Sequence, residues 1–218
     1  FGIGERTGID IPGEQSGTLP TPEWKKSRFK KRQDQTWLPG DLINMSIGQG
    51  YVLMTPIQVA MVYQAIANDG IMLRPTVVDK FLSYDGKEEV RQPVEQRKLG
   101  ISNKNLKLLQ NALKLPVSSN RGTANILRIP GYPVSAKTGT AQNKGKDHSI
   151  FMGFAPMNKP KIAIAVYVEN AGFGATWAVP IASVLMEKYL KGTLSPERMK
   201  TVDEISNTNL IQYGLKEY

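Results

Sequence analysis

The apolar residues after Thr55 point in almost every direction around a helix. Threonine is a good helix N-cap and proline is favoured in the first helical turn, so Thr55-Pro56 predicts a helix start. Gly70 predicts the end of this helix. The apolar positions between them are Ile57, Val59, Ala60, Met61, Val62, Ala65 and Ile66. An apolar surface nearly all round the helix predicts that it is buried.

Two further segments have helical spacing. Ser102 predicts the start of a helix in which Leu106, Leu109 and Leu113 fall on one face, which is typical of core packing. The segment from Trp177 to Leu190 predicts the last long helix of the chain. Residues 1–45 are rich in glycine, proline and charge, and they predict loops with short ordered pieces.

Three strand-like segments follow one another closely. Tyr132 to Ala136 is β-prone, and the apolar runs from Ser149 to Ala155 and from Ile162 to Glu169 come after it at short spacing. Consecutive strands with short connections predict an antiparallel meander. Residues 162–168 are apolar on both faces, which predicts a central strand with helices on both sides of the sheet. The fold class is therefore α+β, an antiparallel sheet covered by helices.

Composition narrows the class of protein. The 218 residues suffice for one sizeable core, and 28 Lys and Arg against 19 Asp and Glu give a net charge of +9. Much of the excess lies between Lys25 and Arg32, which we expect to be a solvated basic run. Trp24 and Phe29 are the only aromatic residues in or beside this run, so nucleic-acid binding is not favoured. With no cysteine and one histidine, His148, thiolate and histidine-rich metal sites are excluded, and no cofactor is expected.

The segment Lys137-Thr138-Gly139-Thr140-Ala141-Gln142 carries the chemistry. A lysine ammonium beside an open strand attracts a carboxylate and favours ionisation of neighbouring hydroxyls. Thr138 and Thr140 add hydroxyl donors, and Gly139 lets another backbone or a substrate lie close to the strand. An exposed strand edge can also bind an extended peptide as one more strand. Alone, such a triplet also fits an exposed basic turn.

The flanking motifs remove that ambiguity. They are Phe1-Gly2-Ile3-Gly4, residues 7–14 (TGIDIPGE), 46–50 (SIGQG), 55–60 (TPIQVA), 67–70 (ANDG) and 122–124 (GTA). In this order they resemble the class B penicillin-binding proteins, of the elongation type. The resemblance implies a penicillin-binding transpeptidase or serine β-lactamase-like fold, with residues 1–192 as the C-terminal portion of the transpeptidase domain and residues 193–218 as a tail.

The resemblance implies a serine enzyme that attacks the D-Ala-D-Ala end of a peptidoglycan stem peptide, forms an acyl-enzyme and is acylated by β-lactams. It assigns catalytic roles to Lys137 and Thr140, including one oxyanion-hole amide from Thr140. It assigns substrate binding to Thr138, Gly139 and Gln142. It also implies elongation-machinery membrane proteins as partners, and a place on the periplasmic side of the bacterial inner membrane with an N-terminal anchor outside this chain.

The family's Ser-x-x-Lys and Ser-x-Asn motifs need separate treatment. Ser27-Arg28-Phe29-Lys30 and Ser118-Ser119-Asn120 fit the two patterns, but Ser27 lies in the basic run without the buried base that a nucleophilic serine needs. We therefore expect both motifs to lie before Phe1, and the isolated chain to be inactive. A non-catalytic cell-wall or protein-binding module with the same fold is the alternative.

Three other polar features have two interpretations each. Asp147-His148 fits an acid-base pair, but a role in fixing the turn before the strand is favoured. Gln49, between two glycines, fits either a brace for the site or a simple turn. Asn170, with the glycine-rich turn that follows it, fits either a rim of the substrate site or ordinary glycine freedom.

Overall fold

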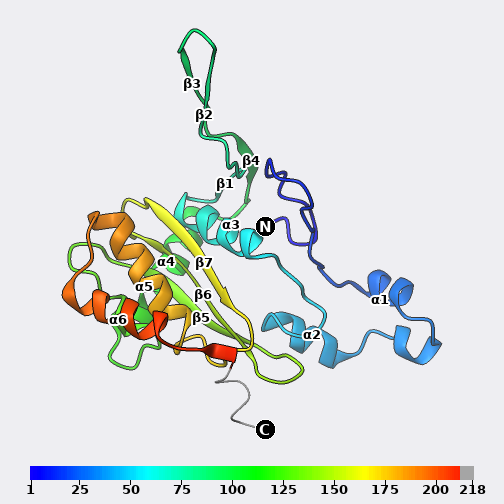
Figure 1. The fold of residues 1–218 in the computed structure, drawn as a ribbon. Coiled ribbons are helices and arrows are strands. Elements are labelled where there is room, and N and C mark those ends of the chain that lie inside the picture. The colour runs from blue at the N-terminus through cyan, green and yellow to red at the C-terminus, as the bar shows by residue number, and fades with distance from the viewer. Residues whose placement is uncertain (212–218) are drawn as a thin grey trace. The chain divides into compact units, whose positions relative to one another are not determined.

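The computed structural model describes residues 1–211 and divides the chain into two compact units (Figure 1). The first comprises Phe1–Gln58 and Arg74–Pro93, and the second comprises Val59–Leu73 and the chain from Val94 onward. Helix α3 (Pro56–Ala67) spans the boundary between them in sequence. None of the helices in this described part is long and apolar enough to cross a membrane.

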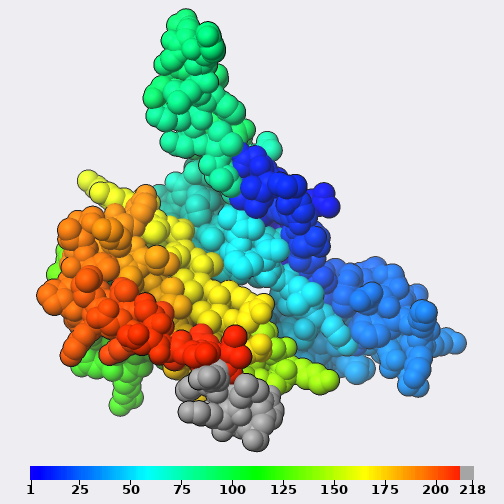
Figure 2. Space-filling view, viewed as in Figure 1, coloured from blue at the N-terminus to red at the C-terminus, as the bar shows by residue number. Residues whose placement is uncertain are grey.

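The first unit contains two short helices, a 3-10 turn and a hairpin. These are α1 (Pro22–Arg28), η1 (Arg32–Gln35), α2 (Pro39–Ser46), β2 (Lys80–Leu82) and β3 (Glu88–Val90). Strands β2 and β3 pair antiparallel across the turn at Tyr84-Asp85-Gly86-Lys87. The residues of both strands are exposed, and Figure 2 shows this hairpin in green.

Asp10 joins distant parts of the first unit. Its carboxylate accepts hydrogen bonds from Thr76 Oγ1 at 2.6 Å and from the Val77 amide at 2.7 Å, and it pairs with Arg91 Nη1 at 2.6 Å. The hydrogen bond from Thr76, followed by that from the Val77 amide, lowers the pKa of Asp10. Asp10 therefore fixes the predicted loop segment to the base of the hairpin.

Lys25 corrects the expectation of a fully solvated basic run. It is only 5% exposed, its Nζ lies 2.6 Å from Asp41 Oδ2, and it sits over the ring of Tyr51. The Asp41 carboxylate also accepts a hydrogen bond from the Leu38 amide at 2.7 Å. One carboxylate therefore caps the start of α2 and also balances the charge of Lys25. A buried cation requires such a partner. The other cations of the run are exposed.

Helix α3 is less buried than its sequence predicts. Met61, Ala65 and Ile66 are buried, but most of its other residues are half-exposed. The predicted start is confirmed in detail. The backbone amide of Gln58 donates to Thr55 Oγ1, and the backbone amide of Thr55 donates to Gln58 Oε1. This is a capping box with reciprocal hydrogen bonds. Gly70, with φ of +86°, follows the helix as predicted.

The second unit is built on the predicted meander. Strands β5 (Ser135–Ala141), β6 (His148–Ala155) and β7 (Ile162–Val168) form an antiparallel sheet in that order. Among residues 1–211, β6 is the central strand and β7 lies at an edge, so the prediction of a central place for residues 162–168 is wrong. Helix α5 packs against β7, whose residues are mostly half-buried.

Helices α4 (Asn103–Ser118) and α5 (Ala178–Lys191) pack against this sheet, and α6 (Pro196–Ser206) packs against α5. The 3-10 turn η2 (Asn125–Leu127) lies between α4 and β5 in sequence. Figure 1 shows α5 lying beside the sheet, and its residues join the buried cluster that includes Phe151 and Val166. Ser102 caps α4 through the Asn105 amide, as predicted. Short strands β1 (Ile71–Leu73) and β4 (Glu95–Lys98) also pair.

Glu187 ties α5 to α6. Its carboxylate is 3% exposed and accepts hydrogen bonds from Lys191 Nζ at 2.8 Å and Ser195 Oγ at 2.9 Å, with Arg198 Nε at 3.8 Å. Burial acts to raise the pKa of Glu187, but the hydrogen bonds from Lys191 and Ser195 outweigh it, so the pKa lies below the usual 4.5. A carboxyl group with a lowered folded-state pKa stabilises the protein above its unfolded pKa and loses this contribution as pH falls.

We therefore predict that Glu187→Gln lowers the free energy of unfolding at pH 7 by about 1–3 kcal/mol, because it leaves the donors poorly satisfied. The difference from wild type should shrink as the pH falls below about 4.5. Chemical denaturation at several pH values measures it, with exposed Glu204→Gln on α6 as the control. A loss that is equal at pH 7 and pH 3 contradicts the prediction.

Candidate functional site

Strand β5 carries Lys137 to Thr140 along the side of the sheet. The register places Thr138 opposite Phe151, Gly139 opposite Ile150 and Thr140 opposite Ser149. Side chains alternate along a strand, so Thr138 and Thr140 share the face on which buried Phe151 packs with α5. Lys137 belongs to the opposite face. Within residues 1–211, β6 is the one strand paired with β5. The other edge of β5 therefore has no described strand beside it.

Lys137 is exposed at this edge. Its Nζ donates a hydrogen bond to the carbonyl oxygen of the next residue, Thr138, at 2.9 Å. The side chain therefore bends back along its own strand, which leaves the ammonium beside the strand rather than extended into solvent. The other donors of the ammonium stay available to an anion, since a lysine carries three N–H groups.

Thr138 makes a side-chain contact that the sequence did not predict. Its Oγ1 lies 2.9 Å from Oγ1 of Thr123, and either hydroxyl can donate. Thr123 belongs to the Gly122-Thr123-Ala124 segment, which marked the family resemblance but received no role. Thr140, two residues further along β5, is half-buried on the same face as Thr138.

A backbone lies close to Gly139, as the sequence predicts, and it belongs to the chain itself. A Cβ atom on Gly174 would lie 2.4 Å from the carbonyl oxygens of both Gly139 and Ile150. Nearby, the Ser149 hydroxyl donates to the Phe173 carbonyl at 2.9 Å and accepts from the Ala178 amide at 3.1 Å. The connection from β7 to α5 is therefore attached to the β5–β6 pair at the middle of the candidate site.

Asn170 begins this connection in the left-handed region, with φ of +52°. Its backbone amide donates to His148 Nδ1 at 3.1 Å, and its side-chain Oδ1 accepts from Asn143 Nδ2 at 2.8 Å. His148 therefore holds the turn as an acceptor, which favours the structural interpretation over an acid-base pair. Gln142, directly after β5, is exposed, and Asn170 connects to its neighbour Asn143 rather than to Lys137.

Gln49 lies in the first unit, in the turn after α2. Its backbone amide donates to the backbone carbonyl of Asn44 at 2.9 Å, and glycines with positive φ flank it on both sides. These features fit the turn interpretation. Its proposed role as a brace for the site remains a prediction.

The two motif look-alikes differ from a catalytic arrangement. Ser27 is exposed on α1, and its hydroxyl donates to the Trp24 carbonyl at 2.9 Å. Ser118 is the last residue of α4 and Ser119 is the C-cap. A nucleophilic serine needs a base within hydrogen-bond reach, and the contacts of Ser27 supply only a carbonyl.

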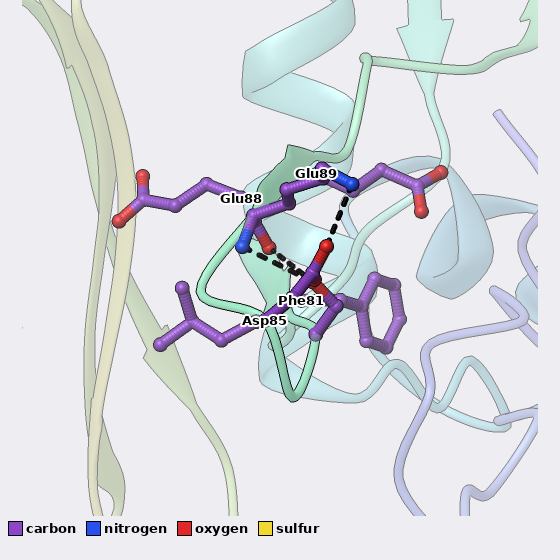
Figure 3. Close-up of a pocket in the computed structure, with 7 residues that line it drawn as sticks. Phe81, Asp85, Glu88 and Glu89 are labelled. Atoms are coloured by element: carbon purple, nitrogen blue, oxygen red, sulfur yellow. Dashed lines mark hydrogen bonds and ion pairs between the residues drawn. The ribbon is translucent and has the colours of Figure 1, made fainter.

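A separate hollow lies on the β2–β3 hairpin of the first unit (Figure 3). It is lined by Phe81, Leu82, Ser83, Asp85, Lys87, Glu88 and Glu89. It contains none of the predicted site residues, and the pairing of two short exposed strands accounts for it. Nor do residues 1–211 contain a group of three or more His, Asp or Glu side chains able to hold a metal ion.

Comparison with known proteins gives one consistent result. The family model of the penicillin binding protein transpeptidase domain matches residues 1–187. The peptidoglycan D,D-transpeptidase MrdA of Acinetobacter baumannii is 32% identical over 99% of this chain and 33% of its own length. MrdA of Escherichia coli K12 is 35% identical over 87% of this chain and 31% of its own length. The chain thus spans about a third of the length of these relatives.

Solved structures agree with the sequence relatives. Pseudomonas aeruginosa PBP2 is 34% identical, with a TM-score of 0.73 over 90% of this chain and 42% of that chain. PBP2 of Helicobacter pylori, solved in complex with MreC, is 29% identical, with a TM-score of 0.71 over 88% of this chain and 34% of that chain.

The close approach at Gly174 gives a prediction about the site's support. Gly174→Ala places a methyl group against two backbone carbonyls, so we expect a loss of about 1–3 kcal/mol in unfolding free energy. Gly100→Ala is the matched control, because a Cβ there meets nothing within 4 Å. Thermal unfolding of both variants tests this, and equal stability of the two variants would contradict the close approach.

Proposed function

Because the chain belongs to the penicillin-binding protein transpeptidase family, of the MrdA type, we propose that it supplies the carboxylate-binding side of a peptidoglycan D,D-transpeptidase active site. The observation that carries the proposal is the arrangement on β5. Lys137, Thr138 and Thr140 lie within four consecutive residues of β5, at an edge without a described strand partner.

The proposed reaction is an acyl transfer in two steps. A serine hydroxyl attacks the carbonyl carbon between the two D-alanines, an ester forms, and the terminal D-alanine leaves with a proton on its amine. The amine of a neighbouring stem peptide then attacks the ester, an amide forms, and the serine regains its proton. A β-lactam acylates the same serine when its ring amide opens. The acyl group is thus moved without a cofactor.

In this reaction the residues of β5 bind and polarise. Lys137 attracts the substrate carboxylate and stabilises negative charge, and the hydroxyls of Thr138 and Thr140 donate to that carboxylate. Gly139 keeps the strand accessible, and Gln142 contacts the substrate where β5 ends. The backbone amide of Thr140 contributes one donor of the oxyanion hole, a type of group worth about 10²–10³ in rate. Gln49 and Asn170 support the site.

The serine is proposed to lie outside residues 1–218, in a Ser-x-x-Lys segment that precedes them. The exposure and hydrogen bonding of Ser27, and the greater length of the relatives, support this assignment. The whole protein is proposed to act on the periplasmic side of the bacterial inner membrane through an N-terminal anchor. Because the H. pylori relative was solved with MreC, we propose elongation-machinery membrane proteins as partners.

The proposal predicts where penicillin binds covalently. After incubation with excess penicillin, intact-mass spectrometry should show one added penicillin on the full-length protein and none on residues 1–218. Acylation of the short chain would show that Ser27 or another local serine reacts. If neither form is acylated, the chain belongs to a non-catalytic module instead.

Loss of the ammonium gives a second prediction. Lys137→Met in the full-length protein should lower the second-order rate constant of penicillin acylation by about 10²-fold, because a charge aimed at the developing anion is removed. Lys144→Met, an exposed lysine in the connection between β5 and β6, controls for the loss of one positive charge. Similar rates for both variants would remove Lys137 from the proposed mechanism.

A further inference from the structure

Thr123 and Thr138 form a hydroxyl pair beside the proposed carboxylate site. Their Oγ1 atoms lie 2.9 Å apart, although the residues are 15 positions apart in sequence. Thr138 is on β5, whereas Thr123 is in the connection between α4 and η2. A contact between two separate elements at hydrogen-bond distance requires that both backbones are held.

The backbone around Thr123 is held by the end of α4. A Cβ atom on Gly122 would lie 2.2 Å from the Pro116 carbonyl oxygen, so only glycine fits there. The amide of Ala124 donates to the same carbonyl at 2.9 Å, and Ala124 is completely buried. Ala124 is therefore bonded to this carbonyl group of the helix and Gly122 lies against it, which leaves the Thr123 side chain exposed in a defined position.

Helix α4 is in turn attached to β5. The hydroxyl of Ser135, at the start of β5, donates to the Gln110 carbonyl of α4 at 3.1 Å, and Ser135 is completely buried. The same helix thus positions both partners of the hydroxyl pair. The pair is a product of the fold rather than a chance contact of two mobile side chains.

The chemistry of hydroxyl groups gives this pair a direction. A threonine hydroxyl has one hydrogen to donate and two lone pairs that accept. If Thr138 donates its hydrogen to a substrate carboxylate, the bond with Thr123 persists only when Thr123 is the donor. Thr123 then polarises the Thr138 hydroxyl and holds it in the rotamer that faces the carboxylate, because linked hydrogen bonds strengthen one another.

We propose that Thr123 is a positioning residue for Thr138, and through it for the carboxylate of the stem peptide or the β-lactam. The inference rests on the proposed function, because Thr138 must itself bind the carboxylate. Thr123 touches neither the reacting carbonyl nor the serine in this account. Its effect is therefore on the binding of the carboxylate more than on the acylation step.

The test compares two forms of one inhibitor on the full-length protein. One is a penicillin with its free carboxylate, and the other is the methyl ester of the same penicillin, which lacks the anion. The variants are Thr123→Val, which keeps the shape but removes the hydroxyl, and Thr123→Ser, which keeps the hydroxyl. Thr193→Val, at another exposed threonine, controls for the substitution itself.

We expect Thr123→Val to lower the second-order acylation rate constant for the acid by about 3- to 10-fold, the effect of one hydrogen bond. Most of this loss should come from a higher half-saturating concentration. Thr123→Ser should restore the rate to within about twofold of wild type. For the methyl ester, Thr123→Val and wild type should react equally. In a Thr138→Val background, the Thr123→Val substitution should cause no further loss, because interacting residues are not additive.

Two results would overturn the inference. Equal losses for acid and ester would show that Thr123 only supports the local structure, and an unchanged rate for the acid would show that it has no role. These results differ from failure of the proposed function. If wild-type full-length protein is acylated by neither inhibitor, the transpeptidase proposal fails and the positioning role falls with it.

Discussion

Strand β6 is hydrogen-bonded on both edges, and the geometry of the candidate site depends on this pairing. Strand β5 is positioned by β6 from one side and by α4 through Ser135. The connection before α5 is attached to the same pair of strands, because Ser149 binds both the Phe173 carbonyl and the Ala178 amide. Gly174 then fits against Gly139 without a side chain. A shift of β6 would therefore move β5 and change the close approach of Gly139 to Gly174.

The sequence predicted this part of the molecule well because its determinants are local. Alternation of residues and short connections specify an antiparallel meander, and hydroxyl caps specify where α3 and α4 begin. Determinants that depend on distant residues were missed. Lys25 was taken as solvated because charge counting cannot reveal Asp41, 16 positions away. The place of β7 at an edge of the described sheet was missed because apolar character reports burial and not strand order.

The hydroxyl pair shows why a motif alone gives an incomplete site. The triplet at Lys137 predicted side chains that bind an anion, but it gave no sign of Thr123, which we propose orients Thr138. Gly122-Thr123-Ala124 carried a signal in its composition: a glycine and an alanine that both pack on one carbonyl group leave one hydroxyl between them in a defined place. Such a signal has no periodicity, so it becomes interpretable only when the end of α4 and the face of β5 are known together.

The chemistry of the described site indicates which steps of the proposed reaction β5 can assist and which need groups from elsewhere in the protein. Strand β5 presents an ammonium, hydroxyls and backbone amides, which stabilise and orient negative charge. The contacts of Ser27 do not supply the base that a nucleophile requires, and His148 is engaged by the Asn170 amide. Groups of this kind accelerate a reaction only where charge develops near them. In the proposed mechanism, the residues of β5 therefore act on a reaction that another segment of the protein initiates, and the rigidity of the β5–β6 pair decides how well the two parts match.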